Sequence, residues 1–483
     1  MRPSIFALLL AVAVAPTLSE TIHGLVLFTR HGDRTSKFYK GYQMTNLGAT
    51  QVHSSGSFYR ARYVEDGAPH KILDISSDTY KPSQLWASAP DQSVLLQTAT
   101  NFLQGLYPPL GTLNRDLAVE TLTNGSDTMT PLNGYQFIQI HGESEEEPDT
   151  IWIKGDDSCP AFTTASNSYR KSAEYNSTLE SSGEFYSQFV EPLAEIMPAK
   201  NVTYAHAYDV FDLLNVGRIH NESVASILST SELSQLRYYA DAWEWGHNYN
   251  LTQPARSIGG MALAGGVLRQ LNETVSSQGD LKLSLLAGSY DTFLAFFGLT
   301  NLTAANADFM GLPDYGSSMA FELFTEDNMT SFPRDTADLR VRFLFRNGTD
   351  ASVPLTAFPL FDRAEDSLAY DDFVDVLGSR AINGVDEWCS TCQSTDGFCS
   401  QKEYSSPSGS SSSNADSESS SSSRCTGLTP VQAGVTGAMT TLGFLALVAA
   451  AVFIYQRMKS KSTSGLPSEK VASDSEAESG ISA

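Results

Sequence analysis

The residues with the clearest chemical potential lie near the N-terminus, in the pentapeptide Arg30–Arg34 (Arg-His-Gly-Asp-Arg). They follow a short apolar run, residues 25–29, which we expect to be a strand buried on both faces. Ligands of open α/β sheets bind outside the carboxyl ends of the strands. Two guanidinium groups at that place can bind phosphate oxygens, and an imidazole between them can attack phosphorus. The pentapeptide predicts an anion site with a histidine nucleophile, and a solvated loop is the alternative.

The elements that would position this site recur as strand-turn-helix units. We expect two more buried strands at residues 83–87 and 281–286, each leading into a helical pattern, at residues 94–106 and 292–299. Such units are typical of an α/β fold with helices on the faces of the sheet.

Two regions depart from this alternation. Residues 120–277, approximately, contain little strand, and we expect them to form a mainly helical insertion over the sheet. Its helical patterns span residues 185–196, 224–245 and 258–275. Residues 319–324 and 339–346 alternate in polarity before an Asn-Gly turn at residues 347–348, which is typical of an antiparallel hairpin.

Further phrases agree in order and spacing with one known family, and the agreement covers most of residues 20–403. The matching phrases are residues 30–34, 41–48, 60–63, 102–109, 158–160 and 315–323. On these phrases the chain resembles the histidine acid phosphatases. The resemblance implies a phosphoglycerate mutase-like α/β fold, in which a mixed sheet is flanked by helices and carries an inserted, mainly helical cap.

The resemblance also implies roles for individual residues. His31 stands at the position of the family's nucleophile, which forms a phosphohistidine. Arg30 and Arg34 stand where the family binds the phosphoryl group, and Asp291 matches the general acid. Because a carboxyl group donates a proton only in its protonated form, we expect a mildly acidic optimum.

Two positions depart from the family pattern. Tyr290 stands where a second histidine is expected, and Gln92 where a third arginine is expected. Both can still donate neutral hydrogen bonds to phosphate, which are weaker than charged ones by roughly 1 kcal/mol or more each. A total loss of about 1 to 4 kcal/mol lowers a rate on the order of tenfold to a thousandfold. We therefore expect a slowed phosphatase, and the alternative is an inactive phosphatase-like domain that binds ligands at the cell surface.

The expected substrates are small phosphate monoesters, and the expected reaction needs no cofactor and no metal ion. The sequence contains no His-Glu-x-x-His motif, Walker phosphate loop or Gly-x-Ser-x-Gly elbow that would suggest another chemistry. Its formal net charge of −24 disfavours nucleic acid as a partner.

Both ends of the chain carry membrane signals. Residues 1–19 are typical of a cleaved signal peptide, and the serine-rich residues 404–430 predict a stalk. Residues 431–455 lack charges and are followed by basic residues, which predicts one membrane-spanning helix and a cytoplasmic tail, residues 456–483. We expect a single-pass type I membrane protein of the cell surface or of a vacuole or lysosome-like compartment, with residues 20–403 as its ectodomain.

Glycosylation signals support a lumenal ectodomain, because Asn-x-Ser/Thr sequons acquire glycans only in the secretory pathway. Nine sequons lie between the two membrane signals, at Asn124, Asn176, Asn201, Asn221, Asn250, Asn272, Asn301, Asn328 and Asn347.

Four cysteines of the ectodomain are candidates for disulfides in this oxidising compartment: Cys159, Cys389, Cys392 and Cys399. Four cysteines allow three pairings. We favour Cys159 with Cys389 and Cys392 with Cys399.

Overall fold

A computed structural model of the chain describes residues 20–400. The predicted signal peptide (1–19), stalk (404–430), spanning segment (431–455) and tail (456–483) lie outside the described residues. Within the described part of the chain, no helix is both long and apolar enough to cross a membrane.

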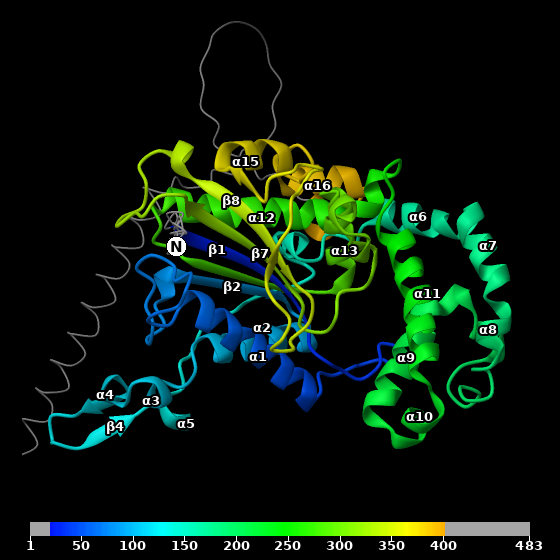
Figure 1. The fold of residues 1–483 in the computed structure, drawn as a ribbon, viewed down its shortest axis with the longest axis horizontal. Helices are drawn as coiled ribbons and strands as arrows, with labels where there is room; N and C mark the ends of the chain where they lie inside the picture. The colour runs from blue at the N-terminus through cyan, green and yellow to red at the C-terminus, as the bar shows by residue number, and fades with distance from the viewer. Residues whose placement is uncertain (1–19, 401–483) are drawn as a thin grey trace, which may run out of the picture. The chain divides into compact units, whose positions relative to one another are not determined.

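An eight-stranded mixed sheet forms the centre of the fold (Figure 1). Its order is β10-β8-β7-β1-β6-β2-β5, and β9 pairs with β8. The central pairs β1–β6, β6–β2 and β2–β5 are parallel, whereas β1–β7, β7–β8, β8–β9 and β8–β10 are antiparallel. The predicted α/β fold with a mixed sheet is therefore confirmed. The strands are β1 (Thr21–Arg30), β2 (Leu85–Pro90), β5 (His141–Glu143), β6 (Leu283–Gly288), β7 (Ser318–Thr325), β8 (Arg340–Arg346), β9 (Thr356–Ala357) and β10 (Ser367–Ala369).

Strand β1 is buried along its whole length, as its apolar run predicted. Leu25 and Leu27 point into the core beneath α1 (Asn46–Tyr63) and α2 (Ser93–Leu106). Val26 and Phe28 point to the opposite face, where the core is formed with helices α12 (Ile258–Ser276), α13 (Tyr290–Leu299), α15 (Tyr370–Gly378) and α16 (Val385–Cys392). Helices thus cover both faces of the sheet (Figure 1).

A helical lobe lies beside the sheet, on the right in Figure 1. It consists of α6 (Pro160–Ser168), α7 (Ala173–Ser181), α8 (Gly183–Ser187), α9 (Ala207–His220), α10 (Glu222–Ile227) and α11 (Thr230–Asn248). The insertion is not helical from residue 120 onward, because its first part forms the hairpin of β3 (Val119–Thr121) and β4 (Asp127–Met129). This hairpin and the short helices α3 (Leu110–Leu113), α4 (Arg115–Ala118) and α5 (Pro131–Gly134) form a separate arm (Figure 1).

The expected helices at residues 94–106, 258–275 and 292–299 are confirmed as α2, α12 and α13. Two others are wrong in extent. The helix expected at residues 185–196 ends early as α8, and Pro192, which has no N–H to donate, lies in the irregular turns that follow. The pattern at residues 224–245 is divided between α10 and α11, because Ser229 and Glu232 form a capping box that begins a new helix.

The antiparallel pair expected at residues 319–324 and 339–346 is confirmed as β7 and β8. The Asn347-Gly348 turn does not connect these two strands. It follows β8, with Gly348 at φ +100°, and the side chain of Asn347 accepts hydrogen bonds from Asp314 N and Ser317 Oγ.

The favoured disulfide pairing is wrong, although all four cysteines form disulfides. The bonds are Cys159–Cys392 and Cys389–Cys399. Cys389 and Cys392 lie one turn apart on α16, and Cys392 is fully buried against the equally buried Cys159. Cys389 is left to pair with Cys399 in α17 (Gly397–Ser400). The two cysteines of the Cys-x-x-Cys motif thus differ in burial, and the buried one pairs with the buried Cys159. The spacing of the motif alone does not show which of the two is buried.

Candidate active site

The pentapeptide lies at the carboxyl end of β1, as predicted. Strand β1 pairs with β6 so that Arg30 is opposite Gly288, and the segment that begins α13 therefore starts beside the pentapeptide. Gly32 lies against the first turn of α1, where an added Cβ would collide with the backbone of Gly48. The carboxyl ends of β1 and β6 and the starts of α1 and α13 therefore meet at one site.

His31 is almost completely buried, with 1% of its surface exposed. Its Nδ1 lies 2.9 Å from Gly32 O, so an N–H at Nδ1 donates to that carbonyl and leaves the lone pair on Nε2. Nε2 has no hydrogen-bond partner among the described residues. Burial lowers the pKa of His31 well below its usual value, and the charges of Arg30 and Arg34 lower it further. The imidazole is thus held neutral with Nε2 free, the state that a nucleophile requires.

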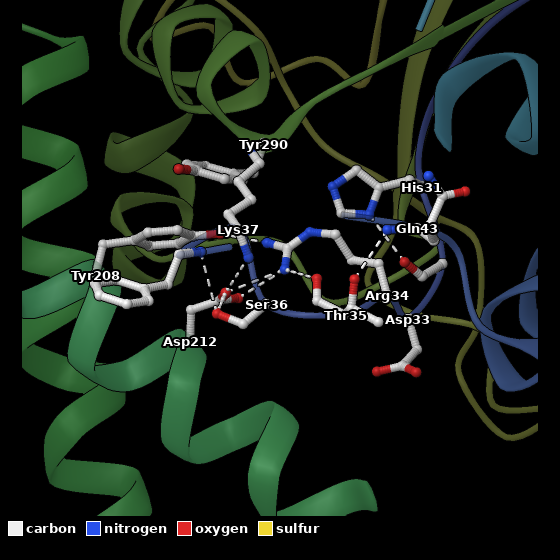
Figure 2. Close-up of polar contacts among 12 residues, drawn as sticks. His31, Asp33, Arg34, Thr35, Ser36, Lys37, Gln43, Tyr208, Asp212 and Tyr290 are labelled. Carbon is white, nitrogen blue, oxygen red and sulfur yellow. Dashed lines mark hydrogen bonds and ion pairs between the residues drawn. The ribbon is translucent and has the colours of Figure 1, made fainter. Parts of the chain in front are cut away.

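Arg34 is bound by the helical lobe (Figure 2). Its Nη1 donates to both carboxylate oxygens of Asp212 in α9, at 3.0 and 3.1 Å, and its Nη2 donates to the hydroxyl of Tyr208 at 2.8 Å. Asp212 also accepts from Ser36 Oγ and from the backbone N–H of Lys37. The lobe therefore holds the loop after β1 in place. The Asp212 carboxylate also partly neutralises Arg34, which leaves less positive charge for a bound phosphate.

Arg30 is buried as well, and its Nη1 donates to the carbonyl of Pro313. Its guanidinium lies 5.2 Å from the ring centroid of Tyr290 and 4.8 Å from that of Tyr315. The Nε atoms of Arg30 and Arg34 have no partner within residues 20–400. With His31 Nε2, three buried nitrogen atoms of the pentapeptide are left without hydrogen bonds among the described residues. A buried polar atom without a partner costs about 1 to 3 kcal/mol, so this loop is suited to an anion.

The hydroxyl of Tyr290, for which we expect a hydrogen bond to phosphate, is engaged by a carboxyl group of the helical lobe. Its hydroxyl donates to Glu244 Oε1 in α11, at 2.7 Å, and Figure 2 shows this hydroxyl on the side of the ring away from His31. Burial raises the pKa of Glu244 to about 8, although the Tyr290 hydrogen bond lowers it. A buried carboxyl group is costly without hydrogen-bond partners, and Glu244 accepts from Tyr290 at Oε1 and from Asn248 Nδ2 at Oε2.

Asp291 lies in the first turn of α13, half-buried, and its Oδ1 accepts from the N–H of Thr292. Its charge acts on two buried groups of the segment before α6, Asp156 and Lys154. Burial and the nearby Asp291 raise the pKa of Asp156 to about 7. Burial alone would lower the pKa of Lys154, but Asp291 and Asp157 raise it above its usual value.

Gln92 is placed at the same edge of the sheet, directly before α2 and just after β2. Because β2 and β6 are parallel, its backbone lies on the side of the sheet that carries the pentapeptide. Its half-buried side chain does not cap α2. The role in phosphate binding that the alignment implies for Gln92 stays a prediction.

The side chain of Asp33 connects two helices. Its buried carboxylate accepts hydrogen bonds from Thr45 Oγ1 and pairs with His220 Nε2 at 2.6 Å. It thus joins the start of α1 to the end of α9 and does not pair with Arg34. The contacts of Tyr208, Asp212, His220 and Glu244 were not predicted, because these residues lie far along the chain and share no motif.

Comparison with known proteins agrees with this geometry. The model of the histidine phosphatase superfamily (branch 2) matches residues 39–346, more than half of the chain. The chain belongs to this superfamily. The matched region starts after the pentapeptide, so this match does not itself include Arg30, His31 or Arg34.

Two relatives of this histidine phosphatase are acid phosphatases. Human lysosomal acid phosphatase is 25% identical over 375 residues, which cover 74% of this chain and 78% of the relative. Rat prostatic acid phosphatase is 24% identical over 376 residues, covering 73% and 85%. The apo phytase of Hafnia alvei is 12% identical and superposes with a TM-score of 0.50 over 78% of this chain and 99% of the phytase, so it shares the fold.

Proposed function

We propose that this histidine phosphatase is an acid phosphatase that hydrolyses phosphate monoesters through a phosphohistidine at His31. The observation that carries the proposal is the set of three buried nitrogen atoms without partners, His31 Nε2, Arg30 Nε and Arg34 Nε. We expect a bound phosphoryl group to accept the hydrogen bonds that the two arginines leave unmade and to lie within reach of Nε2. The acid phosphatase relatives support the same reaction class.

The reaction runs in two steps. Nε2 of His31 forms a bond to phosphorus while the ester P–O bond breaks, and Arg30 and Arg34 bind the peripheral oxygens. Asp291 gives its proton to the departing alkoxide. Water then attacks the phosphohistidine, Asp291 takes a proton from that water, and inorganic phosphate leaves with His31 restored. The buried, neutral imidazole supports the first step, because only an unprotonated Nε2 can attack.

The decisive experiment uses the purified full chain and p-nitrophenyl phosphate from about pH 3 to about pH 7. We expect turnover that is lost in His31→Ala and retained in His206→Ala, a matched change of a half-exposed histidine in the helical lobe. Acid quenching with labelled substrate should leave covalent phosphate on the wild-type chain and none on His31→Ala. Equal rates for the wild type and His31→Ala would contradict the proposal.

A second candidate is a phosphatase-like domain that binds a phosphorylated ligand without hydrolysing it. The ion pair of Arg34 with Asp212 and the engagement of Tyr290 with Glu244 favour it, because both reduce the donors available to a transition state. Ligand binding without covalent phosphate on His31 would support this candidate.

We propose that the phosphatase domain faces the lumen of the secretory pathway, tethered by residues 431–455, at the cell surface or in a lysosome-like compartment. All nine sequon asparagines are exposed or half-buried, so burial excludes none of them as a glycan site. Treatment with an endoglycosidase should lower the apparent mass of the chain, and alkaline extraction should leave it in the membrane. A chain that carries no glycan would contradict this placement.

A further inference from the structure

Lys37 lies three residues beyond Arg34, and its backbone N–H is fixed by Asp212 at 2.8 Å. Its ammonium nitrogen lies 4.5 Å from the ring centroid of Tyr290. The guanidinium of Arg30 lies 5.2 Å from the centroid of the same ring. The two cations therefore contact one aromatic side chain, and Lys37 reaches into the site.

Lys37 also affects the nucleophile electrostatically. Its charge acts together with those of Arg30 and Arg34 to lower the pKa of the His31 imidazole. Burial lowers the pKa of Lys37 itself to about 8, against the opposing effect of Asp291. At acid pH the side chain is therefore a charged ammonium close to both the nucleophile and the proposed acid.

This ammonium has no ion-pair partner. Arg34 is paired with Asp212 and Lys154 with Asp157, but none of the ion pairs within residues 20–400 includes Lys37. A half-buried cation that lacks a carboxylate partner is free to bind an anion from solution.

The site also lacks donors that Lys37 can supply. Arg34 shares its charge with Asp212, and the hydroxyl of Tyr290 is turned to Glu244. A phosphoryl group presents three peripheral oxygens, each of which accepts strong hydrogen bonds from charged donors. A lysine ammonium offers three N–H groups that rotate to suit its acceptor.

We infer that Lys37 is the third phosphate-binding cation of this site, beside Arg30 and Arg34. The inference rests on the proposed function because it concerns the same phosphate-binding site. It requires that phosphate binds there, and it does not require turnover.

The test is the binding of inorganic phosphate to the full chain, measured by titration calorimetry at mildly acidic pH. We expect Lys37→Met, which keeps the length of the side chain and removes the charge, to weaken binding about tenfold to a hundredfold. Lys37→Arg should restore most of the affinity. Lys40→Met, a change at an exposed lysine three residues further on, should leave the affinity unchanged.

Three results would overturn the inference: Lys37→Met binding phosphate like the wild type, a loss that Lys37→Arg does not restore, or a wild type without saturable binding. Equal thermal midpoints for the variants exclude unfolding as the cause of a loss. Phosphate binding that depends on Lys37 without phosphohistidine would refute the phosphatase and leave the role of Lys37 intact. Turnover together with unchanged phosphate binding in Lys37→Met would refute only the role of Lys37.

Discussion

The guanidinium of Arg34 and the carboxylate of Asp212 form a buried ion pair between the loop after β1 and helix α9 of the helical lobe, with Nη1 3.0 Å from Oδ1. Neither side chain is more than 3% exposed. Asp212 also accepts from Ser36 Oγ and from the backbone N–H of Lys37, so one carboxylate binds three residues of the loop after β1. The conformation of this loop therefore depends on the lobe that packs against it.

Replacing Asp212 with Asn should destabilise the protein strongly. The change leaves the Arg34 charge buried without its counter-charge, and breaking a buried pair in this way costs about 3 to 5 kcal/mol. We expect the midpoint of urea unfolding to fall accordingly and kcat/KM to fall with it. The matched control is Asp209→Asn on the same helix, whose half-exposed carboxylate pairs with His206. Similar small losses in both variants would show that the Arg34 pair does not stabilise the fold.

Replacing Tyr290 with Phe should change stability more than activity. The hydroxyl donates to Oε1 of Glu244, so its removal leaves that buried oxygen without its donor, while Asn248 Nδ2 still donates to Oε2. We expect a cost of about 1 to 3 kcal/mol. Because that hydroxyl is turned away from His31, we expect kcat/KM to stay within about threefold of the wild type. Tyr208→Phe is the useful comparison, since it removes an acceptor from Arg34. If Tyr290→Phe lowered kcat/KM tenfold or more, about 1.4 kcal/mol, without loss of stability, its hydroxyl would have to bind phosphate during the reaction.

Glu244 should make the stability of the protein depend on pH. Burial raises its pKa to about 8 from a usual value of 4.5, so the folded state keeps a proton that the unfolded state releases above about pH 4.5. Stability is therefore lost as the pH rises from about 4.5 to about 8, by up to about 1.4 kcal/mol for each pH unit. Glu244→Gln resembles the protonated acid and removes this loss.

We expect Glu244→Gln and the wild type to unfold at similar urea concentrations near pH 4.5 and to diverge as the pH approaches 8, with the variant more stable. Glu180→Gln, at an exposed position, should follow the wild type throughout. Parallel curves for Glu244→Gln and the wild type would mean that Glu244 ionises in the folded protein as it does in water.

The sheet and its flanking helices could be predicted because their signals are local. The apolar run before Arg30 and the helical spacing after residue 93 each report burial within a few residues, and both elements were found where expected. The division of α10 from α11 depends on one capping box at Ser229, which an averaged periodicity does not register. Element type was therefore more predictable than element boundaries.

The site could be predicted only for the residues that share the motif. His31, Arg30 and Arg34 are adjacent in the sequence and at the end of a buried strand, so their proximity follows from the chain itself. Asp212 lies 178 residues beyond Arg34, and its position depends on how the lobe packs against the sheet. The direction of the Tyr290 hydroxyl depends in the same way on Glu244. Such contacts between distant segments leave no pattern in a single sequence.

The disulfide between Cys159 and Cys392 should contribute more to stability than the one between Cys389 and Cys399. The first closes a loop with a sequence separation of 233 residues and joins α16 to the segment before α6, whereas the second closes a separation of 10. In the chain-entropy model, these loops correspond to about 5 and about 3 kcal/mol of stabilisation. We expect Cys159→Ala/Cys392→Ala to lower the unfolding midpoint further than Cys389→Ala/Cys399→Ala, as measured by thermal unfolding under oxidising conditions. The reverse order would mean that the short C-terminal loop, and not the long covalent link across the domain, limits unfolding.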